Sequence, residues 1–422
     1  MEVSYNLRYK KSNFSNRLLI DKEGEVIVYG KGFRLKGKGA GDKGELINFS
    51  EIKEFYFRDE KLIFITFAKE KYVLDGFGTQ FDQFLVDMYR ARNEFLMDAL
   101  FMKGGKLKAE YDAHFDRTSK FGKPINKGNA KLKLYEKTLV VVPATQDAFS
   151  IPYDFVNFHE FDDMEYTLKV VMDDGVTVMI SQLNDDFELF QEKMNDLLGG
   201  LYAGLVNDVL REAFGEYRVD TLLKLAYLMK GGKAVSLKDI SKIDKELAES
   251  VDKFIFEDEA FADKVKSLRE MVDEHSICYG IAKDETVKEG LIKWFMLTIP
   301  EYNIVMFSIL PRWQHGAKEE AAPEDMHDAY FYRIIVEKGN PADKVEDKIR
   351  EIEQALVVLH FAKDPCYKDK RDLRHSPYQY AIRKLPFLRI LRKSFAGKAA
   401  SKDVKDWQKQ AQNILDNAKL KS

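Results

Sequence analysis

The first half of this sequence contains the same apolar pattern twice. The residues Ile47, Phe49, Ile52, Phe57 and Asp59 recur 104 positions later as Ile151, Tyr153, Val156, Phe161 and Asp163. After a shift of two residues, Phe81, Phe84 and Met88 are matched by Phe187, Phe190 and Met194. A repeat of about 100 residues has the size of a small domain, whereas solenoid repeats have periods of about 20 to 50 residues. The pattern therefore predicts two copies of one small domain.

Size and composition fit a folded protein with further domains. The 422 residues are enough for about three domains of roughly 100 to 200 residues each. With 45% hydrophobic and 13% aromatic residues, the chain can bury substantial cores. The net charge is only −3, so attraction to nucleic acid or an anionic membrane would need a local basic patch.

Cysteine content and hydropathy indicate the compartment. Cys278 and Cys366 are the only cysteines, too few for a disulfide framework and without a zinc-type motif, so we expect two reduced, buried thiols. The N-terminal residues contain no apolar signal-peptide segment. No stretch approaches the roughly 20 apolar residues of a spanning helix. These features predict a cytoplasmic protein with no transmembrane segment.

In each copy, segments rich in β-branched and aromatic residues precede an amphipathic helix. The strands predicted in the first copy are 25–29, 32–36, 46–57, 62–67 and 71–74, and a helix follows over 79–102. The strands predicted in the second copy are 131–134, 138–142, 149–161, 166–172 and 176–180, and a helix follows over 184–198. Thr79 and Asn184 are the predicted N-caps, Gly104 and Gly105 are predicted to stop the first helix, and a new region is predicted to begin after Gly199 and Gly200.

This order of elements, with antiparallel strands closed by one C-terminal amphipathic helix, resembles the pleckstrin-homology-like fold. The resemblance covers residues 15–200, taken as two copies. It implies that each copy is a bent, seven-stranded, partly open barrel whose helix covers one open end. Tandem domains of this fold are also similar to the middle regions of certain histone chaperones.

The rest of the chain mixes helices and strands. Helices are predicted over 201–229, 237–254 with Ser236 as N-cap, 259–274, 341–361 and 403–420, and strands over 277–282, 290–299, 303–310 and 329–337. Four strands followed by a helix leave open a third, degenerate copy. The predicted domains are 1–104, 105–200, 201–275, 276–362 and a basic tail over 363–422.

A basic loop in the first copy is a candidate anion site. The spacing from Gly32 to Lys38 fits a phosphate-binding loop, but Gly39 replaces the required Ser or Thr and a strand follows instead of a helix. The cations of this loop are Lys31, Arg34, Lys36, Lys38 and Lys43. In proteins with the pleckstrin-homology-like fold, basic residues between the first strands bind inositol phosphate headgroups. The alternative is a solvated basic hairpin.

A second basic cluster lies near the C-terminus, where cations alternate with apolar residues. The candidate surface residues are Arg383, Lys384, Arg389, Arg392 and Lys393. Such a segment binds an anionic membrane, nucleic acid or a partner protein, or it packs its apolar residues and leaves the cations in water. Pro386 interrupts any continuous helix through it.

The sequence contains no recognisable catalytic constellation. The seven histidines form no metal-ligand pair on a predicted helix, and no Gly-x-Ser-x-Gly motif occurs. We therefore predict an α+β protein that needs no cofactor or metal and is not an enzyme. Its predicted role is a cytoplasmic binding or scaffold protein that engages a macromolecule, most simply a protein, through tandem pleckstrin-homology-like domains. The alternatives are a peripheral membrane protein that binds anionic lipid headgroups and a nucleic-acid or histone-chaperone-like factor.

Overall fold

A computed structural model describes residues 2–39, 41–284, 290–310, 313–314, 328–335, 343–360 and 376–419. These residues form an α+β fold that divides into two compact units. The first unit contains both copies of the repeat, up to Met194, together with helix α9 (Ser376–Lys384). The second unit begins at Asn195 and includes the described residues from Leu385 onward.

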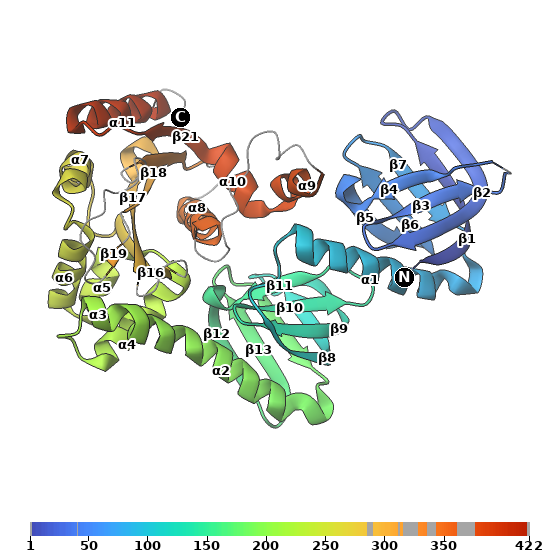
Figure 1. Cartoon of the computed structure of the whole chain (residues 1–422), viewed down its shortest axis with the longest axis horizontal. Coiled ribbons are helices and arrows are strands. Elements are labelled where there is room, and N and C mark those ends of the chain that lie inside the picture. The colour runs from blue at the N-terminus through green and yellow to red at the C-terminus, as the bar shows by residue number, and fades with distance from the viewer. Residues whose placement is uncertain are drawn as a thin grey trace. The chain divides into compact units, whose positions relative to one another are not determined.

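Each copy of the repeat is a seven-stranded antiparallel sheet followed by a long helix (Figure 1). The first module consists of β1 (Val3–Ser12), β2 (Leu18–Tyr29), β3 (Gly32–Gly37), β4 (Glu45–Asn48), β5 (Ile52–Arg58), β6 (Lys61–Thr66), β7 (Lys71–Asp75) and α1 (Phe81–Ala99). The second module consists of β8 (Leu107–Thr118), β9 (Pro124–Tyr135), β10 (Thr138–Pro143), β11 (Phe149–Pro152), β12 (Val156–Asp162), β13 (Thr167–Met172), β14 (Thr177–Ser181) and α2 (Phe187–Leu205). The strand orders β4-β3-β2-β1-β7-β6-β5 and β11-β10-β9-β8-β14-β13-β12 are the same topology.

The structure confirms the duplication seen in the sequence. Matched residues occupy matched places in the two modules, and most of their side chains are buried, although Phe57, Asp59 and Asp163 are exposed. Three such pairs are Ile47 with Ile151, Phe49 with Tyr153, and Phe81 with Phe187. They lie, in that order, in β4 and β11, at the start of the 3₁₀ turns η1 (Phe49–Glu51) and η3 (Tyr153–Phe155), and at the first residue of α1 and α2.

Several local predictions for the modules were wrong. The strands β1 and β8 were not predicted, and the single strands predicted over 46–57 and 149–161 are each broken by a 3₁₀ turn. Thr79 and Asn184 lie in the short turns η2 (Gly78–Gln80) and η4 (Asn184–Asp186), so neither is the N-cap of a long helix. Helix α1 ends at Ala99, before Gly104 is reached.

Helix α2 continues through Gly199 and Gly200, where the sequence suggested a break. A glycine inside a helix costs only about 1 kcal/mol relative to alanine. Buried residues on either side, such as Leu198 and Val206, keep the segment packed and outweigh that cost. The π-type turn η5 (Val206–Leu210) follows directly.

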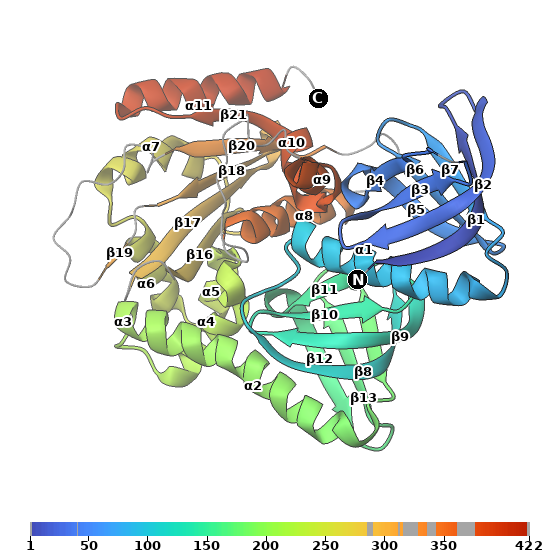
Figure 2. The same cartoon turned by 45° about the vertical axis from the view of Figure 1, so that its right-hand side comes forward.

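The second unit packs helices against a third antiparallel sheet (Figure 2). Its helices are α3 (Arg211–Ala213), α4 (Val219–Met229), α5 (Leu237–Ile243), α6 (Lys245–Ile255), α7 (Glu259–Arg269), α8 (Asp343–His360), α10 (Pro386–Ser394) and α11 (Val404–Lys419). Its strands are β15 (Val235–Ser236), β16 (Ile277–Asp284), β17 (Gly290–Ile299), β18 (Ile304–Ile309), β19 (Trp313–Gln314), β20 (Ala329–Arg333) and β21 (Phe395–Ala399). The described strands follow the order β15-β16-β17-β18-β20-β21, with β19 beside β17. This order differs from that of the two modules, so the described sheet does not match a third copy.

Local capping in the second unit agrees partly with the sequence. Ser236 accepts a hydrogen bond from the Asp239 N–H, as predicted for an N-cap. The helix predicted over 237–254 is divided at Asp244, whose extended backbone ends α5 and whose side chain accepts from the Leu247 N–H to begin α6. Cys278 is a free, half-buried thiol whose pKa is raised by burial, whereas Cys366 lies outside the described residues.

A tryptophan and a glycine are paired across the third sheet. Trp294 of β17 is fully buried, and its Nε1 donates to the carbonyl oxygen of Gly232 at 2.7 Å. Gly280 of β16 lies directly opposite Trp294 in the sheet register. The indole therefore lies over a residue that has no side chain, and its orientation is fixed by the hydrogen bond.

Candidate functional site

The structure does not bring the five cations of the predicted basic loop to one point. Arg34 and Lys36 alternate with the buried Phe33 and Leu35 on β3, as strand geometry predicts. Lys31 precedes this strand, whereas Lys38 and Lys43 follow it. A strand of this length spans roughly 20 Å, so the cations at its two ends cannot bind one small anion.

Acidic residues pair with two of the five cations of this loop. Lys36 lies 3.4 Å from Glu25, and Lys38 lies 2.8 Å from Glu23. The carboxylate of Asp42 accepts hydrogen bonds from Lys22 and from the backbone N–H groups of Gly44 and Gly37, which lower its pKa to about 2. Asp42 thus holds the loop together, a role that the sequence analysis did not anticipate.

Two of the predicted C-terminal cations belong to a contact inside the first unit. The guanidinium of Arg383 lies 4.5 Å from the ring centre of Phe67, and Lys384 donates to the carbonyl oxygen of Lys53. On the same helix, α9, Tyr380 is buried, with its ring 5.1 Å from that of Phe95. These cations therefore attach α9 to the first module and are not a free surface.

The other three predicted cations lie on α10 and are exposed. Helix α10 begins at Pro386, so proline separates it from α9 as predicted. Its apolar side packs toward α8 and β20, with Leu391 buried. Arg389, Arg392 and Lys393 form no ion pair with any residue in the described part of the chain. We call these three residues, together with the neighbouring Phe395, which is 49% exposed, the α10 surface.

The two modules are joined by a buried contact between α1 and the β10–β11 loop. The Arg92 side chain, only 2% exposed, binds Asp147 through Nε at 2.6 Å and Nη2 at 2.8 Å, and lies 4.4 Å from the ring centre of Phe55. Next to it, Asn93 donates to the carbonyl oxygens of Pro143 and Gln146, each at 3.0 Å. A cluster of buried apolar residues from both modules and α9 surrounds this joint. The joint therefore fixes the two modules against each other.

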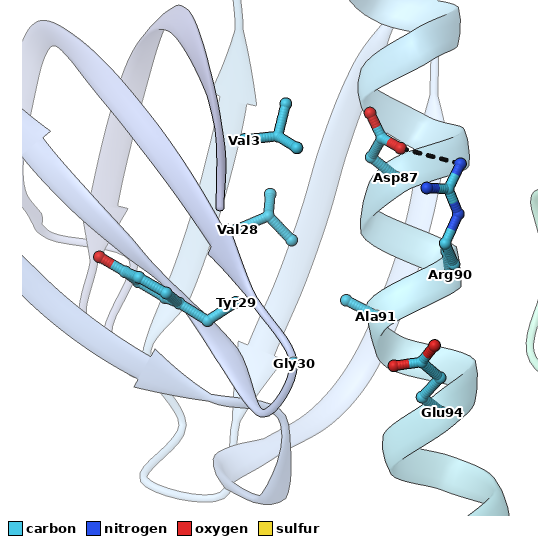
Figure 3. Close-up of a pocket in the computed structure, with 8 residues that line it drawn as sticks. All are labelled: Val3, Val28, Tyr29, Gly30, Asp87, Arg90, Ala91 and Glu94. Carbon is cyan, nitrogen blue, oxygen red and sulfur yellow. Dashed lines mark ion pairs between the residues drawn. The ribbon is translucent and has the colours of Figure 1, made fainter. Parts of the chain in front are cut away.

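A cavity of about 220 Å³ lies between the first sheet and α1 (Figure 3). Val3, Val28 and Gly30 line one side, and Asp87, Arg90 and Glu94 of α1 line the other. Asp87 is 3.1 Å from Arg90 and accepts a hydrogen bond from the hydroxyl of Tyr5. The charge of Asp87 is therefore already compensated within the module.

The contact with Asp87 contributes to a raised pKa of Tyr5. Burial, followed by the hydrogen bond to Asp87, raises the pKa of Tyr5 to about 12. Because the folded pKa lies above the ordinary value near 10, the contact stabilises the module below pH 10 and is lost as the pH rises toward 12. Alkaline spectrophotometric titration should show that Tyr5→Phe has one fewer tyrosine ionising near pH 12 than the native protein. Identical titrations of the two proteins would contradict this assignment.

A second cavity, of about 290 Å³, has acidic side chains in its lining that already bind other groups of the module. Glu45, Glu70 and Tyr72 line it together with Gln379 and Arg383 of α9. The Nζ of Lys11 lies 2.8 Å from Glu45 and 2.9 Å from Glu70. Lys11 offsets one of these two negative charges, and the Tyr72 hydroxyl donates to both carboxylates, so both already have partners within the module.

Within the described residues, no group of three or more His, Cys, Asp or Glu side chains is arranged to hold a metal ion. The helices in that part of the chain include none that is long and apolar enough to cross a membrane. All three cations of the α10 surface are thus exposed and without an ion pair among the described residues, whereas two of the five cations of the basic loop are paired.

Comparison with known proteins adds little to this description. No protein-family model matches the chain, and no curated protein matches it. Among solved structures, it is similar to one described as "Structure of the Spt16D Pob3N heterodimer". The identity is 12%, the match covers 44% of this chain and 96% of that chain, and the TM-score is 0.15. At this identity and TM-score, the similarity assigns no function.

Proposed function

We propose that this protein is a non-catalytic binding protein that holds an acidic segment of a partner protein on the α10 surface. The proposal rests on the exposure of three cations and on their lack of ion pairs. Arg389, Arg392 and Lys393 are exposed and have no ion pair with described residues, whereas Lys36 and Lys38 of the predicted basic loop are paired with acids of their own module and the five cations of that loop do not meet at one point. An unpaired cluster of like charge favours an anionic partner.

The chemistry of the α10 surface fits carboxylates. Two arginines provide planar forks that bind a carboxylate through two parallel hydrogen bonds. Phe395 follows the helix directly and offers an exposed aromatic face for an apolar side chain of the partner. A segment in which acidic and apolar residues are mixed would therefore match both features.

The same geometry weighs against the two other classes of partner. Helices that insert into a membrane surface present their apolar face to the lipid, but in α10 Leu391 is buried within the second unit and Phe387, Leu388 and Ile390 are half-buried. Nucleic acid favours an extended basic surface, and this chain has a net charge of −3.

We also assign the two modules to the pleckstrin-homology-like fold. Their seven strands and closing helix match what that fold requires. Two such modules held rigidly together could bind one partner at two sites at once. Binding at the first site then makes binding at the second site intramolecular, which raises the overall affinity. The joint at Arg92 supports this role because it holds the two modules in one arrangement.

Charge reversal on α10 tests the proposal. The probe is a short, dye-labelled synthetic peptide in which Glu and Leu alternate, and fluorescence anisotropy measures its affinity. The triple variant Arg389→Glu, Arg392→Glu and Lys393→Glu should bind the peptide at least about tenfold more weakly, because three charge-assisted contacts become repulsive. The wild-type affinity should also fall steeply with added salt.

A matched control keeps the total charge change the same. Lys238, Lys405 and Lys409 are exposed in the second unit but lie on other helices, and reversing all three to Glu should leave the affinity within about twofold. Equal losses in the two triple variants would contradict a specific surface. Binding of anionic vesicles or duplex DNA through the α10 cations, with no binding of the peptide, would replace the proposal with one of its rivals.

A further inference from the structure

The duplication places a cation at the same point of both modules. Lys11 in β1 and Arg117 in β8 are each the last residue before a shift in the register with the following strand. Each also lies opposite the second residue of the seventh strand of its module, which is Tyr72 for Lys11 and Val178 for Arg117. The two cations are therefore structural equivalents, 106 residues apart.

In the first module, this cation is compensated several times. The Lys11 side chain is 13% exposed, and its Nζ lies within 3 Å of both Glu45 and Glu70. Burial alone would lower the pKa of Lys11, but hydrogen bonds with Glu45, Tyr72 and Glu70 raise it overall. The module thus supplies its own counter-charges at this point.

In the second module, the equivalent groups are apolar. Glu45 and Phe149 are the first residues of β4 and β11. The carbonyls of Glu70 and Val176 accept the same turn hydrogen bond, from Thr66 and Met172 respectively. The positions of Glu45, Glu70 and Tyr72 are therefore taken by Phe149, Val176 and Val178. The cation remains, but all three of its partners are replaced.

Arg117 is consequently short of partners. It is half-buried, its guanidinium lies 4.6 Å from the ring centre of Phe149, and its Nε is buried without a hydrogen-bond acceptor. It forms no ion pair with a described residue. Asp174 favours the charged form of Arg117 through its negative charge, but it forms no ion pair with Arg117, and its carboxylate accepts from the Val176 N–H. Burial lowers the pKa of Arg117, as expected for a charge with too little compensation.

We propose that Arg117 is a binding site for an Asp or Glu side chain of a partner protein, whose carboxylate takes the place that Glu45 and Glu70 occupy in the first module. A half-buried guanidinium with an unmet donor is costly by itself and gains most from an external carboxylate. The site lies in the first unit, so this inference does not rest on the α10 surface.

The surroundings of Arg117 indicate what else the partner segment contains. The hairpin over residues 117–127 carries Arg117, Lys120, Lys123 and Lys127 and no acidic residue. At its tip Phe121 is 78% exposed, and Ile125 is 47% exposed. An acidic residue flanked by apolar side chains matches this arrangement. A polyphosphate would require several cations converging beside Arg117, but the three lysines of the hairpin are exposed.

The test observes the guanidinium itself. The Nε–Hε resonance of Arg117, assigned by its loss in Arg117→Lys, is followed by NMR in the full-length protein during titration with the Glu-Leu peptide. We expect this resonance to shift with the Glu-Leu peptide but not with a Gln-Leu peptide. Arg117→Gln should lower the affinity measured at this site by about tenfold, whereas Arg117→Lys should retain part of it.

A second variant places a carboxylate of the protein itself next to Arg117. Phe149→Glu restores the counterpart of Glu45, so it should block the peptide response by occupying Arg117. Lys131 of β9, which is already paired with Asp112 of β8, provides the control, and Lys131→Gln should leave the response unchanged. The α10 triple variant should also leave it unchanged, which separates this site from the proposed function.

Three results would overturn the inference. They are an Arg117 resonance that does not move with the Glu-Leu peptide, an equal loss of response in Lys131→Gln, and an Arg117-dependent response to vesicles containing phosphatidylinositol phosphates with none to the peptide. The last result would show that the ligand is a lipid headgroup and not a protein carboxylate.

Discussion

Gly280→Ala should destabilise the second unit by about 3 kcal/mol or more. A Cβ at residue 280 would lie 1.8 Å from Nε1 and 2.1 Å from Cε2 of Trp294. The indole cannot move aside easily, because it is fully buried and hydrogen-bonded to Gly232. Urea unfolding monitored by tryptophan fluorescence measures the change in free energy.

The control for this variant is a glycine of the same unit with free space around it. Gly204 lies in α2, and a Cβ there would meet no atom within 4 Å. Gly204→Ala should therefore stabilise the protein by up to about 1 kcal/mol, through helix propensity alone. If Gly280→Ala is tolerated as well as Gly204→Ala, the packing described for Trp294 is wrong.

Asp147→Ala should destabilise the joint between the two modules by about 3 kcal/mol. The change leaves the Arg92 guanidinium buried without its carboxylate, and Nη1 of this residue already has no hydrogen-bond partner. Asp147 itself is 46% exposed, which places the effect at the lower end for a broken buried pair. Calorimetry of thermal unfolding should show the first unit melting earlier.

The double variant Arg92→Met plus Asp147→Ala separates two contributions to the loss of stability. One is the free-energy cost of burying the unpaired Arg92 charge, and the other is the loss of the ion pair itself. Replacing a buried ion pair by apolar side chains is often close to neutral. We therefore expect the double variant to be more stable than Asp147→Ala alone. A double variant that is less stable than the single one would show that the charge of Arg92 is not the source of the penalty.

The duplication was visible in the sequence because it is carried by large apolar residues at fixed spacing. Phe81 and Phe187, for example, are both buried at the start of a helix, and burial demands such residues in both copies. The strands 25–29 and 32–36 were found for the same reason. Antiparallel pairing and seven strands per sheet followed from the resemblance to a known fold and not from local pattern.

The first strand of each module was missed because its polar residues outnumber its apolar ones. In β1, the buried side chains are Tyr5, Leu7 and Tyr9, which alternate with polar or charged residues. Period-two alternation is the signal of a half-buried strand, and a search for it would have found β1. Aligning β1 with β8 in this way would also have paired Lys11 with Arg117.

Long-range contacts decided which candidate cations are free, and these were beyond sequence reasoning. Arg383 and Arg389 are six residues apart, yet the first lies on Phe67 while the second has no ion pair among the described residues. Nothing in the sequence identifies Arg92 as the partner of Asp147, 55 positions away. Such pairings depend on the tertiary arrangement alone.

The position of α9 has a consequence for biosynthesis. Tyr380 completes the apolar cluster around Phe95, although the rest of that cluster lies within the first 148 residues of the chain. As the polypeptide leaves the ribosome, both modules emerge long before this tyrosine does. Their shared apolar surface therefore stays uncovered until α9 has also been synthesised, a period in which a nascent-chain chaperone would have its target there.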